Sequence, residues 1–137
     1  MSTKKVIIVT HGHLAEALIK ALAEIVGDVR DFYAVNFEIH ESLNDLKEKL
    51  EEILNKSPNS EFIILVDFFG GSPCNCACHF LINPKVYVIS GVNFPMLVEV
   101  ATKKDTTDVK KLCEDIVKAG RNSIVDVKKK LISECNF

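Results

Sequence analysis

The 137-residue chain lacks any apolar run near the roughly 20 residues that a membrane-spanning helix needs. It also lacks a signal-peptide pattern at its start, where an apolar, strand-like segment begins almost at once. Charge of one sign is not in excess: the formal net charge is −2, which gives no reason to expect nucleic acid or an acidic membrane as a partner. With no internal repeat and no long linker, these absences predict a cytoplasmic protein that folds as a single domain over residues 1–137.

Two further absences concern chemistry. Neither a P-loop nor a G-x-G-x-x-G pattern occurs, so the sequence gives little support for binding of ATP or a dinucleotide. We expect no cofactor. The five cysteines are an odd number and do not resemble the framework of a disulfide-stabilised secreted domain. Cys74, Cys76 and Cys78 precede His79, but a helix would turn Cys76 away from the face that Cys74 and Cys78 share, so four ligands would not converge on zinc. We predict no metal site and interpret these cysteines as small apolar residues.

What the chain does contain is a regular alternation of strand-like and helix-like segments. The predicted strands are Lys5–Val9, Phe32–Phe37, Phe62–Val66 and Val86–Ser90, and Ile124–Val127 is a candidate for a fifth, short antiparallel strand at the C-terminus. The predicted helices are His13–Val26, Leu43–Leu54, a helix entered at Pro73 that ends near Ile82, Met96–Lys103, and Thr107–Ala119 closed by Gly120. This alternation predicts an α/β fold with an open, mostly parallel sheet and helices on both of its faces.

Two polar residues follow strands that the fold should bring together. The flavodoxin-like strand order, expected for a sheet of this size, places the first strand beside the third at the point where ligands bind. His11 follows the first strand and Asp67 follows the third, so we expect their side chains to share one crevice. The carboxylate can hold one ring N–H and leave the other nitrogen as a base, a metal ligand or a nucleophile. Taken alone, the stretch around His11 is equally consistent with an ordinary surface turn.

A glycine-rich turn lies just beyond Asp67. Gly70-Gly71-Ser72-Pro73 leads into a predicted helix, where free N–H groups attract an anion and glycine lets the backbone approach it closely. The Ser72 hydroxyl adds a further donor. A glycine pair alone is weak evidence for an anion site, because such pairs usually only make turns. Together with a nucleophilic histidine, however, the loop indicates transfer of a phosphoryl group to that histidine.

Three motifs in this order resemble the mannose-family enzyme IIA of the bacterial sugar phosphotransferase system. They are "VTHG" after the first strand, "DFFGGSP" after the third and "GVNFPMLVE" after the fourth. The resemblance implies that His11 accepts a phosphoryl group from the phosphocarrier HPr and passes it to enzyme IIB, which serves the membrane components that take up mannose-, fructose- or sorbose-type sugars. It implies that Asp67 supports His11, and it places Ser72 at the hydroxyl position of the family's glycine-rich loop. We expect Gly12, Gly71 and Ser72 to bind the phosphoryl group. It also implies an open α/β fold and a homodimer formed by an exchanged C-terminal strand.

Two segments depart from the family pattern. Cys74–His79 replaces a stretch that usually carries a phenylalanine and small residues, and the chain after Gly120 follows the pattern only loosely. One alternative is the phosphocarrier subunit of a dihydroxyacetone kinase, which also begins with a strand-one histidine but lacks "GGSP" and "GVNFPML". The other alternative is a binding module that holds a flavin phosphate or another small anion in the same crevice without turnover.

Overall fold

A computed structural model describes residues 3–135 and contains one sheet of four parallel strands. The strands are β1 (Lys4–His11), β2 (Phe32–Phe37), β3 (Glu61–Val66) and β4 (Val86–Ser90). Their order in the sheet is β2-β1-β3-β4, so Val6 of β1 lies opposite Phe32 on one side and Ile63 on the other. The predicted α/β fold is confirmed, with the first strand beside the third.

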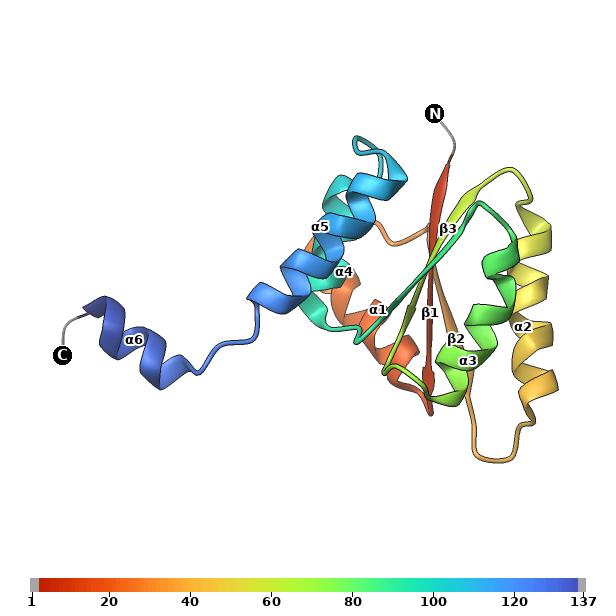
Figure 1. Cartoon of the computed structure of the whole chain (residues 1–137), viewed down its shortest axis with the longest axis horizontal. Helices are drawn as coiled ribbons and strands as arrows, with labels where there is room; N and C mark the ends of the chain where they lie inside the picture. Colours follow the sequence, from red (N-terminus) through yellow and green to blue (C-terminus); the bar gives the residue numbers. More distant parts are fainter. Residues whose placement is uncertain (1–2, 136–137) are drawn as a thin grey trace.

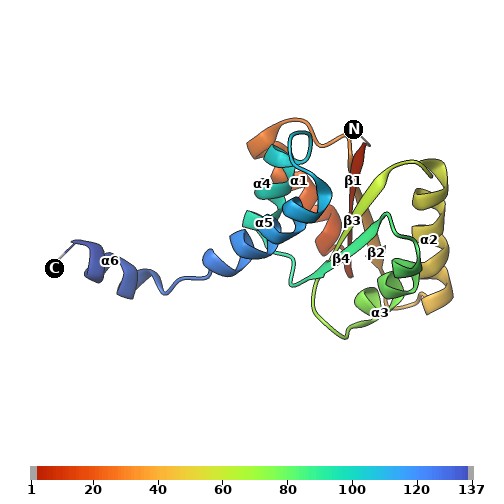
Figure 2. The same ribbon diagram turned by 45° about the horizontal axis from the view of Figure 1, so that its top comes forward.

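Helices cover both faces of this sheet. They are α1 (Leu14–Val26), α2 (Leu43–Lys56), α3 (Ser72–Cys78), which continues as the 3₁₀ turn η1 (His79–Ile82), α4 (Phe94–Lys103), α5 (Val109–Asn122) and α6 (Val127–Cys135). Figures 1 and 2 show α1, α4 and α5 on one face and α2 with α3 on the other. Among the helices described over residues 3–135, none has both the length and the apolar character that crossing a bilayer requires.

The residues of β1 alternate between two separate hydrophobic cores. Val6 and Ile8 pack among residues of α1, α4 and α5, whereas Ile7 and Val9 pack among residues of α2 and α3. All four side chains have no exposed surface. A strand covered by helices on both faces must be apolar at every position, which explains why the sequence shows an unbroken apolar run here and no alternation.

Gly120 does not close α5, contrary to the sequence-based expectation. The helix continues to Asn122, and Gly120 is buried inside it. A Cβ atom at this position would lie 2.7 Å from Cγ of Met96 in α4. The glycine therefore permits close packing of α5 on α4, a contact between distant segments that a local helix-ending rule does not detect.

The fifth strand expected at Ile124–Val127 is absent from the described part of the chain, and this prediction was wrong. Residues 124–126 form no regular element, and α6 begins at Val127 and extends away from the sheet (Figure 1). The side chain of Asp126 accepts a hydrogen bond from the Lys129 N–H at 3.2 Å and so begins the helix. With no neighbouring strand to pair with, the chain from Val127 onward satisfies its backbone groups within α6 instead.

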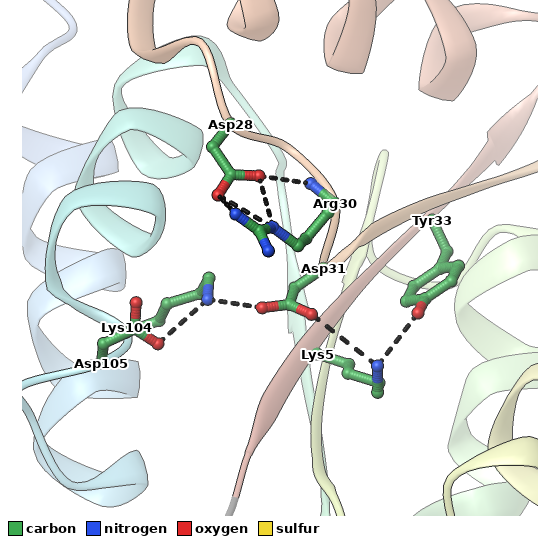
Figure 3. Close-up of polar contacts among 7 residues, drawn as sticks. All are labelled: Lys5, Asp28, Arg30, Asp31, Tyr33, Lys104 and Asp105. Atoms are coloured by element: carbon green, nitrogen blue, oxygen red, sulfur yellow. Dashed lines mark hydrogen bonds and ion pairs between the residues drawn. The ribbon is translucent and has the colours of Figure 1, made fainter.

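A network of ion pairs ties together the amino ends of the strands, the region called here the amino edge (Figure 3). Asp31, which precedes β2, accepts a hydrogen bond from Nζ of Lys104 at 2.8 Å, and its other oxygen lies 3.7 Å from Nζ of Lys5. Lys5 also donates to the Tyr33 hydroxyl at 3.1 Å. Lys104 donates in addition to Asp105 at 3.0 Å. The network therefore links β1 and β2 to the segment that follows α4.

Candidate functional site

The chain reverses direction directly after His11. β1 extends two residues further than predicted, because His11 still pairs with Phe37 of β2. Gly12, with a φ of 57°, makes the turn into α1. The buried hydroxyl of Thr10 accepts the N–H of Ala15 at 2.7 Å and anchors the start of that helix. Thr10 was not singled out from the sequence, although a hydroxyl residue just before a helix is a recognised helix-start signal.

The structure brings His11 and Asp67 together at the carboxyl ends of β1 and β3. The Asp67 carboxylate receives the backbone N–H of His11 at 3.0 Å and lies 2.7 Å from Nδ1 of its ring, both through Oδ2. Its other oxygen accepts the N–H of Phe68 at 3.1 Å. An ionised carboxylate can only accept hydrogen bonds, so Nδ1 carries the proton. Nε2 then keeps a lone pair, and within residues 3–135 it has no hydrogen-bond partner.

The environment keeps Asp67 ionised. Its side chain is 13% exposed, whereas that of His11 is 45% exposed. Burial on its own would raise the pKa of Asp67, but the hydrogen bonds from the backbone N–H and the ring of His11 outweigh burial and lower the pKa below its ordinary value. A carboxylate held in its charged form stabilises a positive charge on the neighbouring ring.

The glycine-rich loop follows Asp67 and leads into α3. Gly70 has a φ of 88°, and its carbonyl accepts the side-chain amide of Asn75 at 3.2 Å. Gly71 is the residue before α3, and Ser72 is the first residue of that helix, where backbone N–H groups have no acceptor within the helix. Two nearby N–H groups already have acceptors: that of Gly12 donates to the Phe37 carbonyl at 2.8 Å, and that of Gly71 donates to the Phe68 carbonyl at 3.4 Å.

His13 differs from His11 in the state of both ring nitrogens. Its Nε2 lies 2.6 Å from a carboxylate oxygen of Glu38, and its Nδ1 lies 3.2 Å from one of Glu16. Hydrogen bonding to Glu16, and then to Glu38, raises the pKa of His13 above its ordinary value. Because both of its ring nitrogens face carboxylate oxygens, this histidine is poorly suited to act as a nucleophile.

The loop after β4 lies at the same carboxyl edge of the sheet, next to the end of β3. The N–H of Val92 donates to the carbonyl of Val66, the last residue of β3, at 3.0 Å. The side chain of Asn93 accepts the N–H of Met96 at 3.3 Å and donates to the Gly120 carbonyl at 3.2 Å. These contacts tie the loop to the end of β3 and to α5, and so fix its position.

The cysteines of α3 are arranged differently from the helical-face prediction. Cys74 and Cys76 are both buried in the core between α3 and the sheet, and Cys78 is exposed. The helix is short and packs against both the sheet and α2, which is why it buries more than one stripe of residues. No arrangement of His, Cys, Asp or Glu in the described part of the chain could hold a metal ion.

Known proteins resemble the chain over most of its length. A family model described as "PTS system fructose IIA component" matches residues 5–117. The sorbose-specific EIIA component of the phosphotransferase system of Lacticaseibacillus casei is 30% identical over 115 residues, which cover 83% of each chain. The mannose-specific EIIAB component of Escherichia coli K12 is 33% identical over 135 residues, which cover 96% of this chain but 42% of that protein.

A solved structure supports the same assignment. The phosphotransferase system IIA protein associated with the fucose utilization operon of Streptococcus pneumoniae superposes with a TM-score of 0.85 at 26% identity, over 96% of this chain and 99% of that chain. Motifs, strand order and these similarities agree, and the chain belongs to the mannose-type enzyme IIA family of the sugar phosphotransferase system.

Proposed function

We propose that this protein is a phosphohistidine carrier, in which His11 accepts a phosphoryl group from HPr and passes it to an enzyme IIB. The observation that carries the proposal is the 2.7 Å contact between Nδ1 of His11 and Asp67. It assigns the ring proton to Nδ1 and leaves the Nε2 lone pair in a half-exposed position at the carboxyl edge of the sheet.

The transfer requires little covalent chemistry beyond this nitrogen. The Nε2 lone pair bonds to phosphorus while the bond between phosphorus and the donor breaks, and the ring, which still holds its Nδ1 proton, gains a positive charge. The ionised Asp67 stabilises that charge and holds Nδ1 of the ring in place. Because the transition state for phosphoryl transfer is loose, positioning and charge stabilisation supply most of the rate.

The glycine-rich loop is the proposed binding site for the phosphoryl oxygens. A carboxylate repels phosphate, so Asp67 cannot bind these oxygens itself. At the start of α3, Ser72 offers its N–H group and a hydroxyl, whereas the N–H of Gly71 already donates to the Phe68 carbonyl at 3.4 Å. Gly12 contributes by making the turn that presents His11, since its own N–H is already bonded to Phe37.

The names of the relatives suggest the partner proteins and the class of sugar that we propose for this domain. Relatives are described as sorbose-, mannose- and fructose-specific components, and we propose that this domain likewise works in the cytoplasm with HPr and a IIB protein, for a sugar of that class. Membrane components would be reached only through IIB. Sugar specificity would lie in those other chains.

Mass spectrometry tests the carrier function directly. The protein is incubated with HPr, phosphoenolpyruvate and the enzyme that transfers the phosphoryl group from phosphoenolpyruvate to HPr. It should gain the mass of one phosphoryl group. His11→Ala should gain none, whereas His13→Ala should be labelled like the wild type. Peptide mapping that located the phosphate on His13, or full labelling of His11→Ala, would refute the assignment.

The same experiment separates the carrier from a module that only binds an anion. A phosphohistidine is a phosphoramidate, so the added mass should be lost in acid and kept in alkali. It should also disappear when an enzyme IIB is supplied as acceptor. A protein that bound phosphate or a flavin phosphate but never gained this mass would be a binding module.

We further propose that the protein forms a homodimer through β4 and the C-terminal segment. Among the described strands β4 pairs with β3 alone, and beside it lies a groove of about 420 Å³ whose lining includes Val88, Ile89 and Val117. Ile124, which is 79% exposed, lies at this groove, and Val125 is also exposed. An unpaired edge strand next to an exposed apolar segment favours pairing with another chain.

Sedimentation of the intact chain tests this assembly. A dimer is expected at micromolar concentration, and Val125→Lys with Ile124→Lys should shift it toward the monomer. Lys128→Glu, a charge change further along the exposed tail, is the matched control and should leave the dimer intact. A monomeric wild-type protein at this concentration would refute the proposal.

A further inference from the structure

Phe68 covers one face of the His11 ring. The two rings are stacked, with centroids 5.3 Å apart and planes that differ by 14°. Phe37 meets the same imidazole edge-on, at 6.0 Å and 65°. The Phe68 side chain is nevertheless 55% exposed, so hydrophobic burial alone does not account for its position.

The same phenyl ring also rests on Gly71. A Cβ atom at residue 71 would lie 2.8 Å from Cζ of Phe68 and 3.1 Å from both of its Cε atoms. The backbone of Gly71 has a φ of −73° and a ψ of 167°, angles that any residue adopts. The backbone conformation therefore does not call for glycine here, but any larger residue would displace the phenyl ring from its present position. Phe68 connects the histidine to the glycine-rich loop.

A single hydrogen bond does not fix the plane of an imidazole. The contact from Nδ1 to Asp67 holds one atom of the ring, which leaves rotation about the Cβ–Cγ bond only loosely restricted. A flat ring stacked on one face removes that freedom. It leaves the in-plane direction of the Nε2 lone pair open, because stacking covers the face of a ring and not its edge.

We propose that Phe68 is a positioning residue for phosphoryl transfer, which holds the His11 ring so that Nε2 points along the line of attack, and that Gly71 is the residue that makes room for it. This inference rests on the proposed carrier function of His11. In the transfer, the bond from Nε2 to phosphorus forms as the donor's bond to phosphorus breaks, and Phe68 takes no part in either bond. Phe68 restricts the orientation of the nucleophile, and the rate of transfer depends on how well the reacting atoms are oriented.

The first test asks whether a flat ring is needed at residue 68. Phe68→Leu keeps an apolar side chain but removes the stack, and the single-turnover rate at saturating phosphorylated HPr should fall about tenfold. Phe68→Tyr restores a flat ring and should recover the rate. Phe69→Leu is the matched control, since its 84% exposed ring is adjacent and has no ring contact with His11. A wild-type rate in Phe68→Leu, or an equal loss in Phe69→Leu, would overturn the proposal.

The second test uses the contact between Phe68 and Gly71. Gly71→Ala should slow transfer by displacing the phenyl ring, and Phe68→Ala should slow it by removing that ring. The double variant should be no slower than Phe68→Ala, because its new methyl group meets no ring. Residues that act through one contact show this non-additivity. Losses that multiply in the double variant would show that Gly71 acts independently of Phe68 and would contradict the proposed link.

Proton NMR of the unphosphorylated protein separates this inference from the carrier function. The ring current of Phe68 should shift the His11 ring protons upfield, and Phe68→Leu should abolish the shift while Phe69→Leu retains it. If the wild type takes up the phosphoryl group but the upfield shifts of the His11 ring protons persist unchanged in Phe68→Leu, the positioning role alone is refuted. A wild type that is never phosphorylated would refute the carrier function instead, whatever the shifts.

Discussion

The two ends of the sheet use polar residues in opposite ways. At the amino edge, Lys5, Asp31 and Lys104 each contact at least two polar partners, and these contacts join one element to another (Figure 3). At the carboxyl edge, His11 is held through Nδ1 but keeps Nε2 free of any described partner. Polar groups whose hydrogen bonds are all made stabilise a fold, whereas a group that is held in place but keeps a free lone pair can react. Substitutions at the two edges should therefore change different quantities.

The largest expected effect is at the carboxyl edge. Asp67→Ala should slow phosphoryl transfer about a hundredfold in both directions, because the His11 ring loses both its orientation and the stabilisation of its charge. The free energy of unfolding should fall by only about 1 kcal/mol, since water can replace the lost hydrogen bonds at this exposed edge. Rapid-quench kinetics and urea unfolding measure the two quantities.

Asp67→Asn serves as the control for that substitution. It keeps the shape and the fold, but an amide can donate where a carboxylate only accepts, so it can favour the wrong tautomer of His11. Transfer should be slow here as well. Wild-type rates in both variants would mean that the observed pair has no role in the reaction.

Lys104→Met should have the reverse effect. The side chain of Lys104 is 10% exposed, and removing its ammonium group leaves Asp31 without its closest partner. We expect a loss of about 2 kcal/mol in unfolding free energy, less than the roughly 3–5 kcal/mol for breaking a fully buried pair, because Asp31 is partly exposed. Transfer rates should not change. Lys103→Met, at the neighbouring and more exposed position, should cost less stability. Slow transfer in Lys104→Met would show that the two edges are coupled.

Local patterns in the sequence predicted most of the fold and the central pair of the site. The apolar runs of β1 and β3 indicated strands, and in the structure helices cover both faces of each; α2 begins with a capping box formed by Ser42 and Asp45. These features depend on residues close in the chain or on the general order of such sheets. The proximity of His11 and Asp67 followed from that order alone.

What the sequence did not reveal depends on contacts between distant residues. Gly120 leaves room for Met96 and Gly71 leaves room for Phe68, so neither glycine marks the helix end or flexible turn that a local rule suggests. The tail beyond Ser123 is a similar case. Its apolar residues predicted a strand, but a strand forms only where a neighbouring strand can pair with it. Side-chain stacking on His11 left no sequence signal beyond an aromatic residue next to Asp67.

The titration of Asp67 should report its contact with His11. Because the folded-state pKa of Asp67 is lowered, the contact stabilises the fold above the carboxyl's ordinary pKa of 3.8, and this stabilisation is lost as pH falls through the folded pKa. Carbon-13 NMR of the carboxyl group should find its midpoint below 3.8 in the wild type and higher in His11→Ala. The variant keeps the backbone N–H of residue 11, so an unchanged midpoint would mean that the hydrogen bond from the His11 ring is weak in solution.

The smallest expected effect belongs to the exposed pair near the amino edge, Asp28 and Arg30. Hydrogen bonds from the Arg30 side chain lower the pKa of Asp28 to about 2, and the partners are 58% and 81% exposed. The pair therefore stabilises the fold above the ordinary pKa of Asp28 and stops doing so as pH falls through about 2, but water and salt screen an interaction this exposed. Arg30→Ala should raise the carboxyl midpoint of Asp28 toward 3.8, as followed by NMR, and should leave the melting temperature at neutral pH and the transfer rate unchanged. A clear drop in melting temperature would show that even the solvent-facing pairs of this edge stabilise the fold, and a slower transfer would show that the amino edge influences the reaction at the other end of the sheet.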